Sequence, residues 1–129
     1  MNVQKIYKHQ LTEIGFNNLL PHDLKQATQT YFTPIEVAQT AATWLTENNE
    51  KKILDIGAGV GKFCIAAARI NNCDFYGVEY RKSLIDLGNE LIERYEIDNA
   101  KMIHTNIIDV DFSDYDAFYL FSPFYENLE

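Results

Sequence analysis

The chain has 129 residues, a hydrophobic fraction of 47% and a formal net charge of −8, from 11 Lys and Arg against 19 Asp and Glu. This length favours one domain with a single core, and the lack of a long apolar run or signal-peptide core favours a soluble cytoplasmic protein without a membrane partner. The acidic balance does not support nucleic acid as a partner, because phosphate backbones need a basic patch and a short pair such as Arg81-Lys82 does not provide one.

The first third of the chain predicts helices. Residues 1–32 are loosely patterned, and we expect an N-terminal helical extension interrupted at Pro21. Thr33-Pro34-Ile35-Glu36 predicts a helix start, because Thr33 can cap, Pro34 suits the first helical position and Glu36 completes a capping box. Apolar residues at helical spacing then predict a helix that stops near residue 48.

From residue 52 onward, predicted strands alternate with predicted helices. The strands cover about 52–56, 74–79, 102–104 and 117–121, and the helices cover 61–70 and about 83–95. This alternation predicts an α/β fold with a parallel sheet and right-handed crossovers. We therefore expect one domain over 1–129, with its α/β core over 33–129.

A glycine-rich turn joins the first strand to the next helix in the sequence DIGAGVGKF, residues 55–63. Alternate glycines let the backbone turn sharply and let a ligand lie against it, and Glu79, at the end of the second strand, suits the hydroxyls of a ribose. A dinucleotide fingerprint needs a small residue where this chain has Lys62, which argues against a nicotinamide cofactor. The alternative is a tight turn that packs a helix on a strand and binds nothing.

The pattern Asp-x-Gly-x-Gly-x-Gly followed by Glu79 resembles motif I of the class I S-adenosylmethionine-dependent methyltransferases. The resemblance implies a Rossmann-like sheet of order 3-2-1-4, S-adenosyl-L-methionine as cofactor and methyl transfer as the reaction. It places the glycines under the methionine part of the cofactor, Asp55 near its amino group and Glu79 on the ribose. The family's usual sheet has seven strands, whereas this sequence ends after the fourth, so we expect the tail, a partner or an oligomer to cover the fourth strand, or the chain to be a fragment.

Other segments extend the resemblance on the cofactor side. Asn106 stands where the family commonly has an Asp that accepts the adenine amino group, although it can equally shape a turn. Tyr80 can stack on the adenine. Thr33 lies in a Tyr-Phe-Thr-Pro segment similar to one that closes over the cofactor in some adenine-N6 methyltransferases, and helix capping explains the same residue. The implied cofactor-binding set is Asp55, Gly57, Ala58, Gly59, Gly61, Glu79, Tyr80, Asn106, Ile107 and Thr33.

The segment Ser122-Pro123-Phe124-Tyr125 resembles motif IV of the amino-methyltransferases, with Phe124 in place of a second proline. The resemblance implies catalytic roles for three residues: Ser122 and the Pro123 carbonyl would accept hydrogen bonds from an amine, and Tyr125 would stack on it. A loop that only leads the chain out of the fourth strand explains the same residues. The spacing of Cys and His residues predicts no metal site.

We thus expect an S-adenosylmethionine-dependent methyltransferase whose acceptor is unidentified, a nitrogen of a protein, a metabolite or a base. The alternative is a non-catalytic module that binds the cofactor, or a fragment of a larger methyltransferase.

Overall fold

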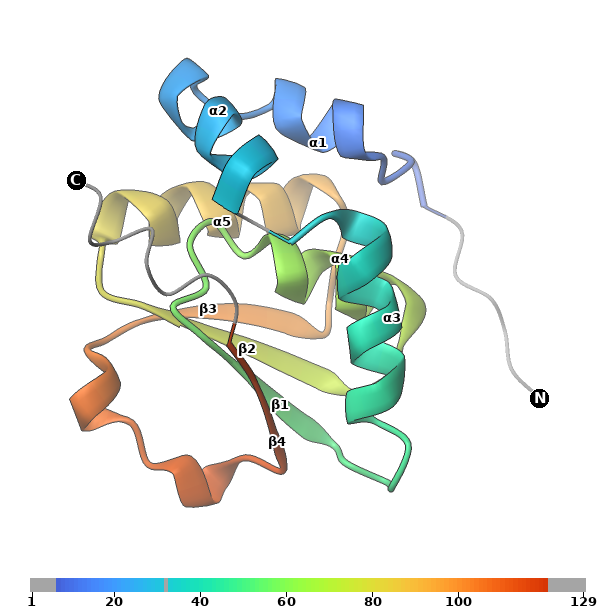
Figure 1. Cartoon of the computed structure of the whole chain (residues 1–129), viewed down its shortest axis with the longest axis vertical. Coiled ribbons are helices and arrows are strands. Elements are labelled where there is room, and N and C mark those ends of the chain that lie inside the picture. Colours follow the sequence, from blue (N-terminus) through green and yellow to red (C-terminus); the bar gives the residue numbers. More distant parts are fainter. Residues whose placement is uncertain (1–6, 32, 121–129) are drawn as a thin grey trace.

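The computed structural model describes residues 7–31 and 33–120 (Figure 1). The helices are α1 (Glu13–Asn18), α2 (His22–Tyr31), α3 (Ile35–Leu45), α4 (Lys62–Ile70) and α5 (Lys82–Arg94), with short 3-10 turns η1 (Ile107–Asp109) and η2 (Phe112–Asp114). The strands are β1 (Lys52–Ile56), β2 (Asp74–Glu79), β3 (Ala100–His104) and β4 (Ala117–Leu120). Within these described ranges, no helix is long and apolar enough to cross a membrane.

The four strands form one parallel sheet of order β3-β2-β1-β4. In register, Ile53 of β1 lies opposite Phe75 of β2 on one side and Ala117 of β4 on the other. The chain therefore moves outward from β1 to β3 and then returns to the other side of β1. The predicted α/β class and strand order are confirmed. The strand order reverses between β1 and β4, and sheets of this kind bind ligands at such a reversal point.

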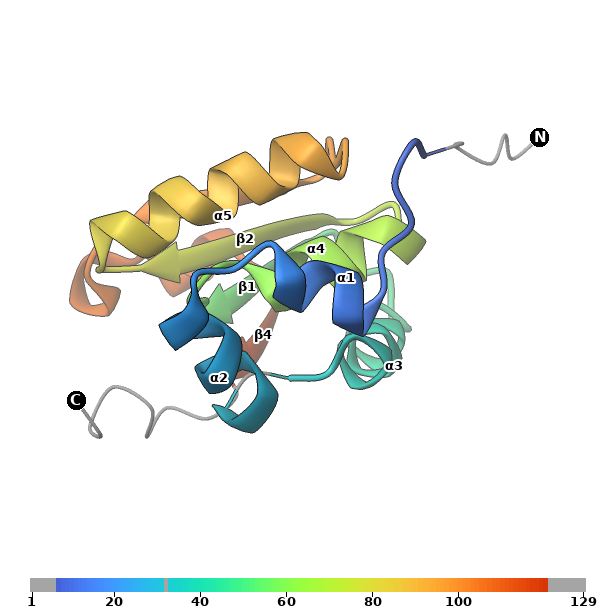
Figure 2. The same cartoon turned by 90° about the horizontal axis from the view of Figure 1, so that it is seen from above.

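One hydrophobic core joins the helices to the sheet. It combines Phe16 of α1, Ala38 of α3 and Leu91 of α5 with the buried strand residues Ile53 and Phe75. Figure 2 shows these helices layered over the strands. The opposite face of β4 carries the half-exposed Phe118, which meets the ring of Phe112 from η2 edge-on at 5.7 Å. Helix α1, which precedes residue 33, packs in the same core as the sheet. The division of the chain at residue 33 into an N-terminal extension and an α/β core stays a prediction.

The helix starts differ from those that the capping patterns predicted. Pro34 is the N-cap of α3 and not its first residue, and no side chain of the cap bonds the helix. The prediction that Thr33 caps α3 is wrong, because its hydroxyl pairs with that of Tyr119 instead. The Ile35 N–H donates to Glu13 Oε1 of α1 at 2.9 Å, so a residue 22 positions away supplies the missing acceptor.

Candidate functional site

The glycine turn between β1 and α4 has the backbone that its sequence predicts. Gly57, Gly59 and Gly61 have φ angles of 70°, 61° and 80°, in the left-handed region that only glycine enters without strain. A Cβ on Gly61 would also lie 2.8 Å from the sulfur of Met102. The Ala58 N–H donates to the Val78 carbonyl at 2.9 Å, which fixes the turn against β2. The turn therefore holds its backbone at the carboxyl ends of β1 and β2.

Glu79, the last residue of β2, is 2% exposed and accepts hydrogen bonds from two parts of its surroundings. The Gly59 N–H donates to its Oε1 at 3.0 Å, so the carboxylate and the glycine turn are in direct contact. Arg81 donates to Oε2 through its backbone N–H at 3.0 Å and its Nε at 2.9 Å, and to Oε1 through Nη2 at 3.2 Å. The predicted ribose acceptor therefore lies against the glycine turn, and Arg81 donates to both of its oxygens.

Asp55 is almost as buried as Glu79, at 5% exposed, but has few partners. Among the described residues, its one hydrogen bond comes from the Cys64 thiol, at a sulfur–oxygen distance of 3.9 Å. Burial, and then the nearby charge of Glu79, raise the pKa of Asp55 well above its usual range. A buried carboxyl with spare acceptor capacity suits a ligand amino group.

A small cavity opens beside Asp55, between the glycine turn, α4 and β4. Its volume of about 20 Å³ holds about one water, so a larger ligand requires its walls to move. The ring of Tyr119 stacks on that of Phe63 at a centroid distance of 3.9 Å and forms one wall. The cavity is lined by Thr33, Asp55, Gly57, Ala58, Lys62, Phe63 and Tyr119.

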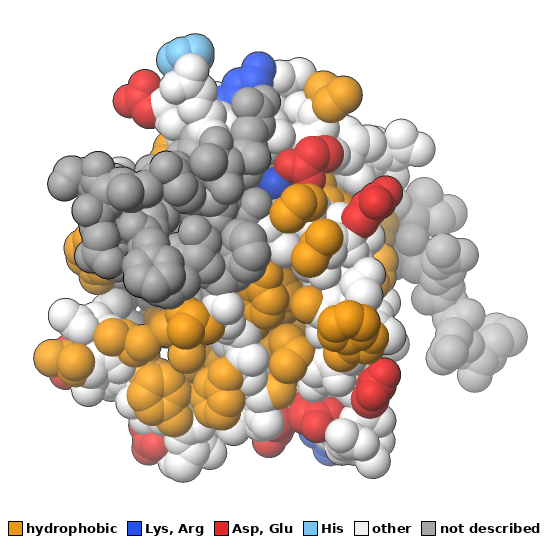
Figure 3. Space-filling model, viewed as in Figure 1, with side chains coloured by type: hydrophobic (Ala, Val, Ile, Leu, Met, Phe, Trp, Pro, Cys, Tyr) orange, Lys and Arg blue, Asp and Glu red, His pale blue; other side chains and the backbone are white. Residues whose placement is uncertain are grey.

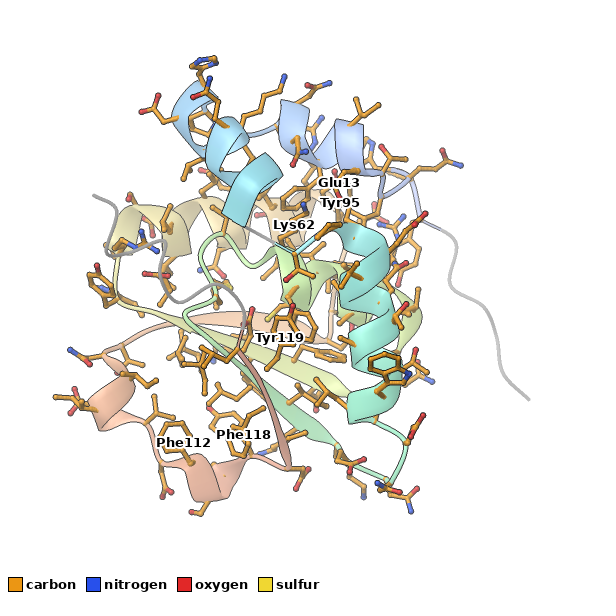
Figure 4. The ribbon with its side chains drawn as sticks, viewed as in Figure 1. Glu13, Lys62, Tyr95, Phe112, Phe118 and Tyr119 are labelled. Atoms are coloured by element: carbon orange, nitrogen blue, oxygen red, sulfur yellow. The ribbon has the colours of Figure 1, made fainter. Side chains whose placement is uncertain are left out.

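Lys62, the first residue of α4, is a site residue that the sequence did not single out as such. Its side chain is only 3% exposed, and its ammonium forms an ion pair with Glu13 of α1. Figure 4 shows Lys62 between Glu13 and the region of Tyr119. Burial alone would raise the pKa of Glu13, but the hydrogen bonds and charge of Lys62, together with the Ile35 N–H, lower it. The only sequence signal was a lysine directly after a glycine turn.

The predicted adenine side is less complete. The Oδ1 of Asn106 accepts from the Ile108 N–H at 3.2 Å, so this amide shapes the start of η1, as in the turn interpretation. The neighbouring Ile107 is 43% exposed. Tyr80 is half-exposed beneath the guanidinium of Arg81, 5.5 Å from its ring centre, and its carbonyl accepts from His104 Nε2 at 2.9 Å. Stacking of Tyr80 on an adenine and a contact from Ile107 remain predictions.

The predicted catalytic residues Ser122, Pro123 and Tyr125 lie outside the described residues. Over 7–31 and 33–120, no group of three or more His, Cys, Asp or Glu could hold a metal ion. Thr33, Asp55, Gly57 and Ala58 share the cavity, whereas Gly59 and Glu79 meet on the β2 side of the turn.

Residues 47–122 match the family model described as "Methyltransferase domain", which covers more than half of the chain. A demethylmenaquinone methyltransferase from Geobacillus sp. (strain WCH70) is 29% identical over 66 residues, covering 50% of this chain and 28% of that protein.

Solved structures of methyltransferases share the fold. An RNA methyltransferase from Salinibacter ruber, in complex with S-adenosyl-L-homocysteine, aligns with a TM-score of 0.60 and 22% identity over 68% of this chain and 58% of the other. A precorrin-6y C5,15-methyltransferase from Geobacter metallireducens aligns with a TM-score of 0.57 and 18% identity over 71% and 50%. The chain thus spans between about a quarter and three fifths of the length of these relatives.

Proposed function

The chain belongs to the methyltransferase domain family, and on that premise we propose that it binds S-adenosyl-L-methionine and transfers its methyl group to an acceptor nucleophile. The observation that carries the proposal is the contact of Glu79 with the Gly59 N–H, at the reversal point of a parallel sheet. This contact places a buried carboxylate against a backbone turn that only glycines can form. A ribose bound to Glu79 would therefore lie against the glycine turn.

In the proposed complex the ribose and the amino-acid end of the cofactor meet different carboxyl groups. The ribose hydroxyls replace the Arg81 guanidinium on Glu79, and the amino group approaches Asp55. Gly57, which lines the cavity, gives the cofactor an open backbone surface because it has no side chain. Gly61 serves the turn, because a side chain there would meet Met102. Asn106 and Tyr80 remain the candidates for the adenine, at the ends of β3 and β2.

Methyl transfer needs an acceptor atom in line with the sulfonium methyl group. We propose that Ser122 and Pro123 accept hydrogen bonds from a nitrogen nucleophile while Tyr125 stacks on it, and that displacement proceeds in one step. The acceptor is a nitrogen of a protein, a metabolite or a base. The net charge of −8 makes free nucleic acid the least favoured of these.

We also propose that a partner or a second copy of the chain covers the edge of β4. This strand is at the edge of the described sheet, and Phe118 and Leu120 on it are 42% and 58% exposed. Figure 3 shows hydrophobic side chains gathered on this face. An exposed apolar edge strand favours association, which sedimentation velocity at several concentrations would detect. The cytoplasmic location stays a prediction.

Titration calorimetry tests the cofactor first. S-adenosyl-L-methionine and S-adenosyl-L-homocysteine should each release or absorb heat with saturation, whereas NADH should not. No saturable heat from either sulfur compound at high protein concentration would reject the proposal.

Transfer is then tested with methyl-labelled cofactor and fractionated cell extract. Label in an extract component that is lost with Ser122→Ala would support methyl transfer at the proposed place. Binding without label in any component would instead favour the non-catalytic module.

A further inference from the structure

Lys62 is a buried cation in a place where local structure does not favour one. It is the first residue of α4, which has no side-chain cap and no acidic residue in its first turn. The N-terminus of a helix carries partial positive charge, and burial of an ammonium costs free energy unless anions compensate it. Its 3% exposed side chain therefore needs acidic partners from elsewhere in the fold.

Glu13 supplies one such partner and is itself held in place from two other directions. Its Oε1 accepts from the Ile35 N–H at 2.9 Å, and its Oε2 accepts from Asn17 Nδ2 at 3.2 Å as well as from Lys62. An ammonium has three N–H donors, and among the described residues Glu13 is the one acceptor of a hydrogen bond from Lys62. The Phe16 ring, 5.8 Å from Lys62 Nζ, takes part only as an aromatic face. Lys62 thus keeps donors for a second acceptor.

The cavity that Lys62 lines also contains Asp55, whose oxygens have only the distant thiol of Cys64 as a partner among the described residues. One small cavity therefore combines a cation with spare donors and a carboxyl with spare acceptor capacity. A ligand that presents an ammonium and a carboxylate on one carbon, an α-amino acid, complements both groups.

We propose that Lys62 binds the α-carboxylate of the cofactor's amino-acid end and so makes the site specific for cofactors that carry this carboxylate. The inference rests on the proposed function, which supplies the cofactor. Glu13 positions the ammonium from α1 and leaves it free to donate to the ligand. The amino-acid end enters as Thr33 and Tyr119, whose hydroxyls pair across the cavity, move apart.

The test compares two ligands that differ only in the carboxylate: S-adenosyl-L-homocysteine and its decarboxylated amine analogue. The unmodified protein should bind the homocysteine compound at least about tenfold more tightly, which is typical of a hydrogen bond to a charged group. Lys62→Met should remove this preference. Lys82→Met is the matched control, because Lys82 is 65% exposed on α5 and pairs with Asp86, and it should leave the preference unchanged.

Glu13→Gln separates ligand binding by Lys62 from a purely structural role. The amide can still accept from the Ile35 N–H but no longer competes as an anion for Lys62, so the preference for the carboxylate should increase several-fold. A thermal melt would show whether Lys62→Met folds. If it does not, Glu13→Gln alone tests whether Lys62 binds the carboxylate. An unchanged preference in Glu13→Gln, or a preference that survives in folded Lys62→Met, would overturn the inference.

Failure of the unmodified protein to bind either compound would instead reject the proposed function. Equal binding of both compounds would leave the proposed function standing and overturn the role of Lys62.

Discussion

Glu79 is the last residue of β2 and Asp55 the next to last of β1. Both are almost equally buried and carry the same acidic group, yet their surroundings differ. Both oxygens of Glu79 accept hydrogen bonds from Gly59 or Arg81, whereas Asp55 has one weak thiol partner among the described residues. A carboxylate with its hydrogen bonds complete stabilises the fold, and one without them costs stability until a ligand arrives. At Glu79 the protein itself therefore supplies the hydrogen-bond donors, whereas at Asp55 a ligand would supply them.

The largest effect should come from Glu79→Ala, which removes the carboxylate whose two oxygens both accept hydrogen bonds within the protein. The Arg81 guanidinium and the Gly59 N–H lose their acceptor, and removing one partner of a buried ion pair costs about 3 kcal/mol. Binding of S-adenosyl-L-homocysteine should fall below detection, because the ribose loses its acceptor. Urea unfolding and calorimetry measure the two effects. Glu90→Ala, on the exposed face of α5, is the control and should change neither.

Asp55→Asn should affect binding and stability in opposite directions. Binding of S-adenosyl-L-homocysteine should weaken about tenfold, because an amide attracts an ammonium less than a carboxylate does. The thermal midpoint should rise, because the variant no longer buries an acidic group with so few partners. Differential scanning fluorimetry without ligand measures the rise, and a lower midpoint would contradict the contrast with Glu79.

The same contrast predicts a dependence on pH. Since the pKa of Asp55 is raised in the folded state, the folded protein keeps a proton that the unfolded chain loses above about pH 4. The stabilising effect of that proton is complete at lower pH and is lost as pH rises toward the folded pKa. The free energy of unfolding of Asp55→Asn relative to the unmodified protein should therefore increase with pH over this range. Parallel curves in urea unfolding at several pH values would show that Asp55 does not titrate in this way.

The sequence predicted the part of this site that depends on local backbone rules. Gly57, Gly59 and Gly61 were identifiable because left-handed backbone requires glycine, and Glu79 because it ends a buried strand beside that turn. The strand order was also predictable from the alternation of elements and the family resemblance.

The rest depends on residues that only the folded chain brings together. Glu13 and Lys62 are 49 positions apart, and Thr33 and Tyr119 are 86 apart, so no spacing pattern could pair them. The capping box failed for the same reason, because a distant carboxylate on α1 took the role expected of Thr33. Sequence patterns thus predicted the glycine turn, Asp55 and Thr33, and missed Lys62, Phe63 and Tyr119, which line the rest of the cavity.

The smallest effect should come from Arg81→Met, which removes the guanidinium that donates to Glu79 and leaves the Glu79 carboxylate in place. Loss of the guanidinium should lower the free energy of unfolding by about 1.5–3 kcal/mol, the usual range for a hydrogen bond to a charged group. Binding of S-adenosyl-L-homocysteine should tighten about threefold, because the ribose hydroxyls no longer have to displace the guanidinium from Glu79. Calorimetry measures this change, with Arg94→Met at the exposed end of α5 as a control of equal charge. Weaker binding of Arg81→Met would mean that Arg81 contacts the ligand directly, and that the hydrogen bonds of Glu79 are kept in the complex instead of exchanged.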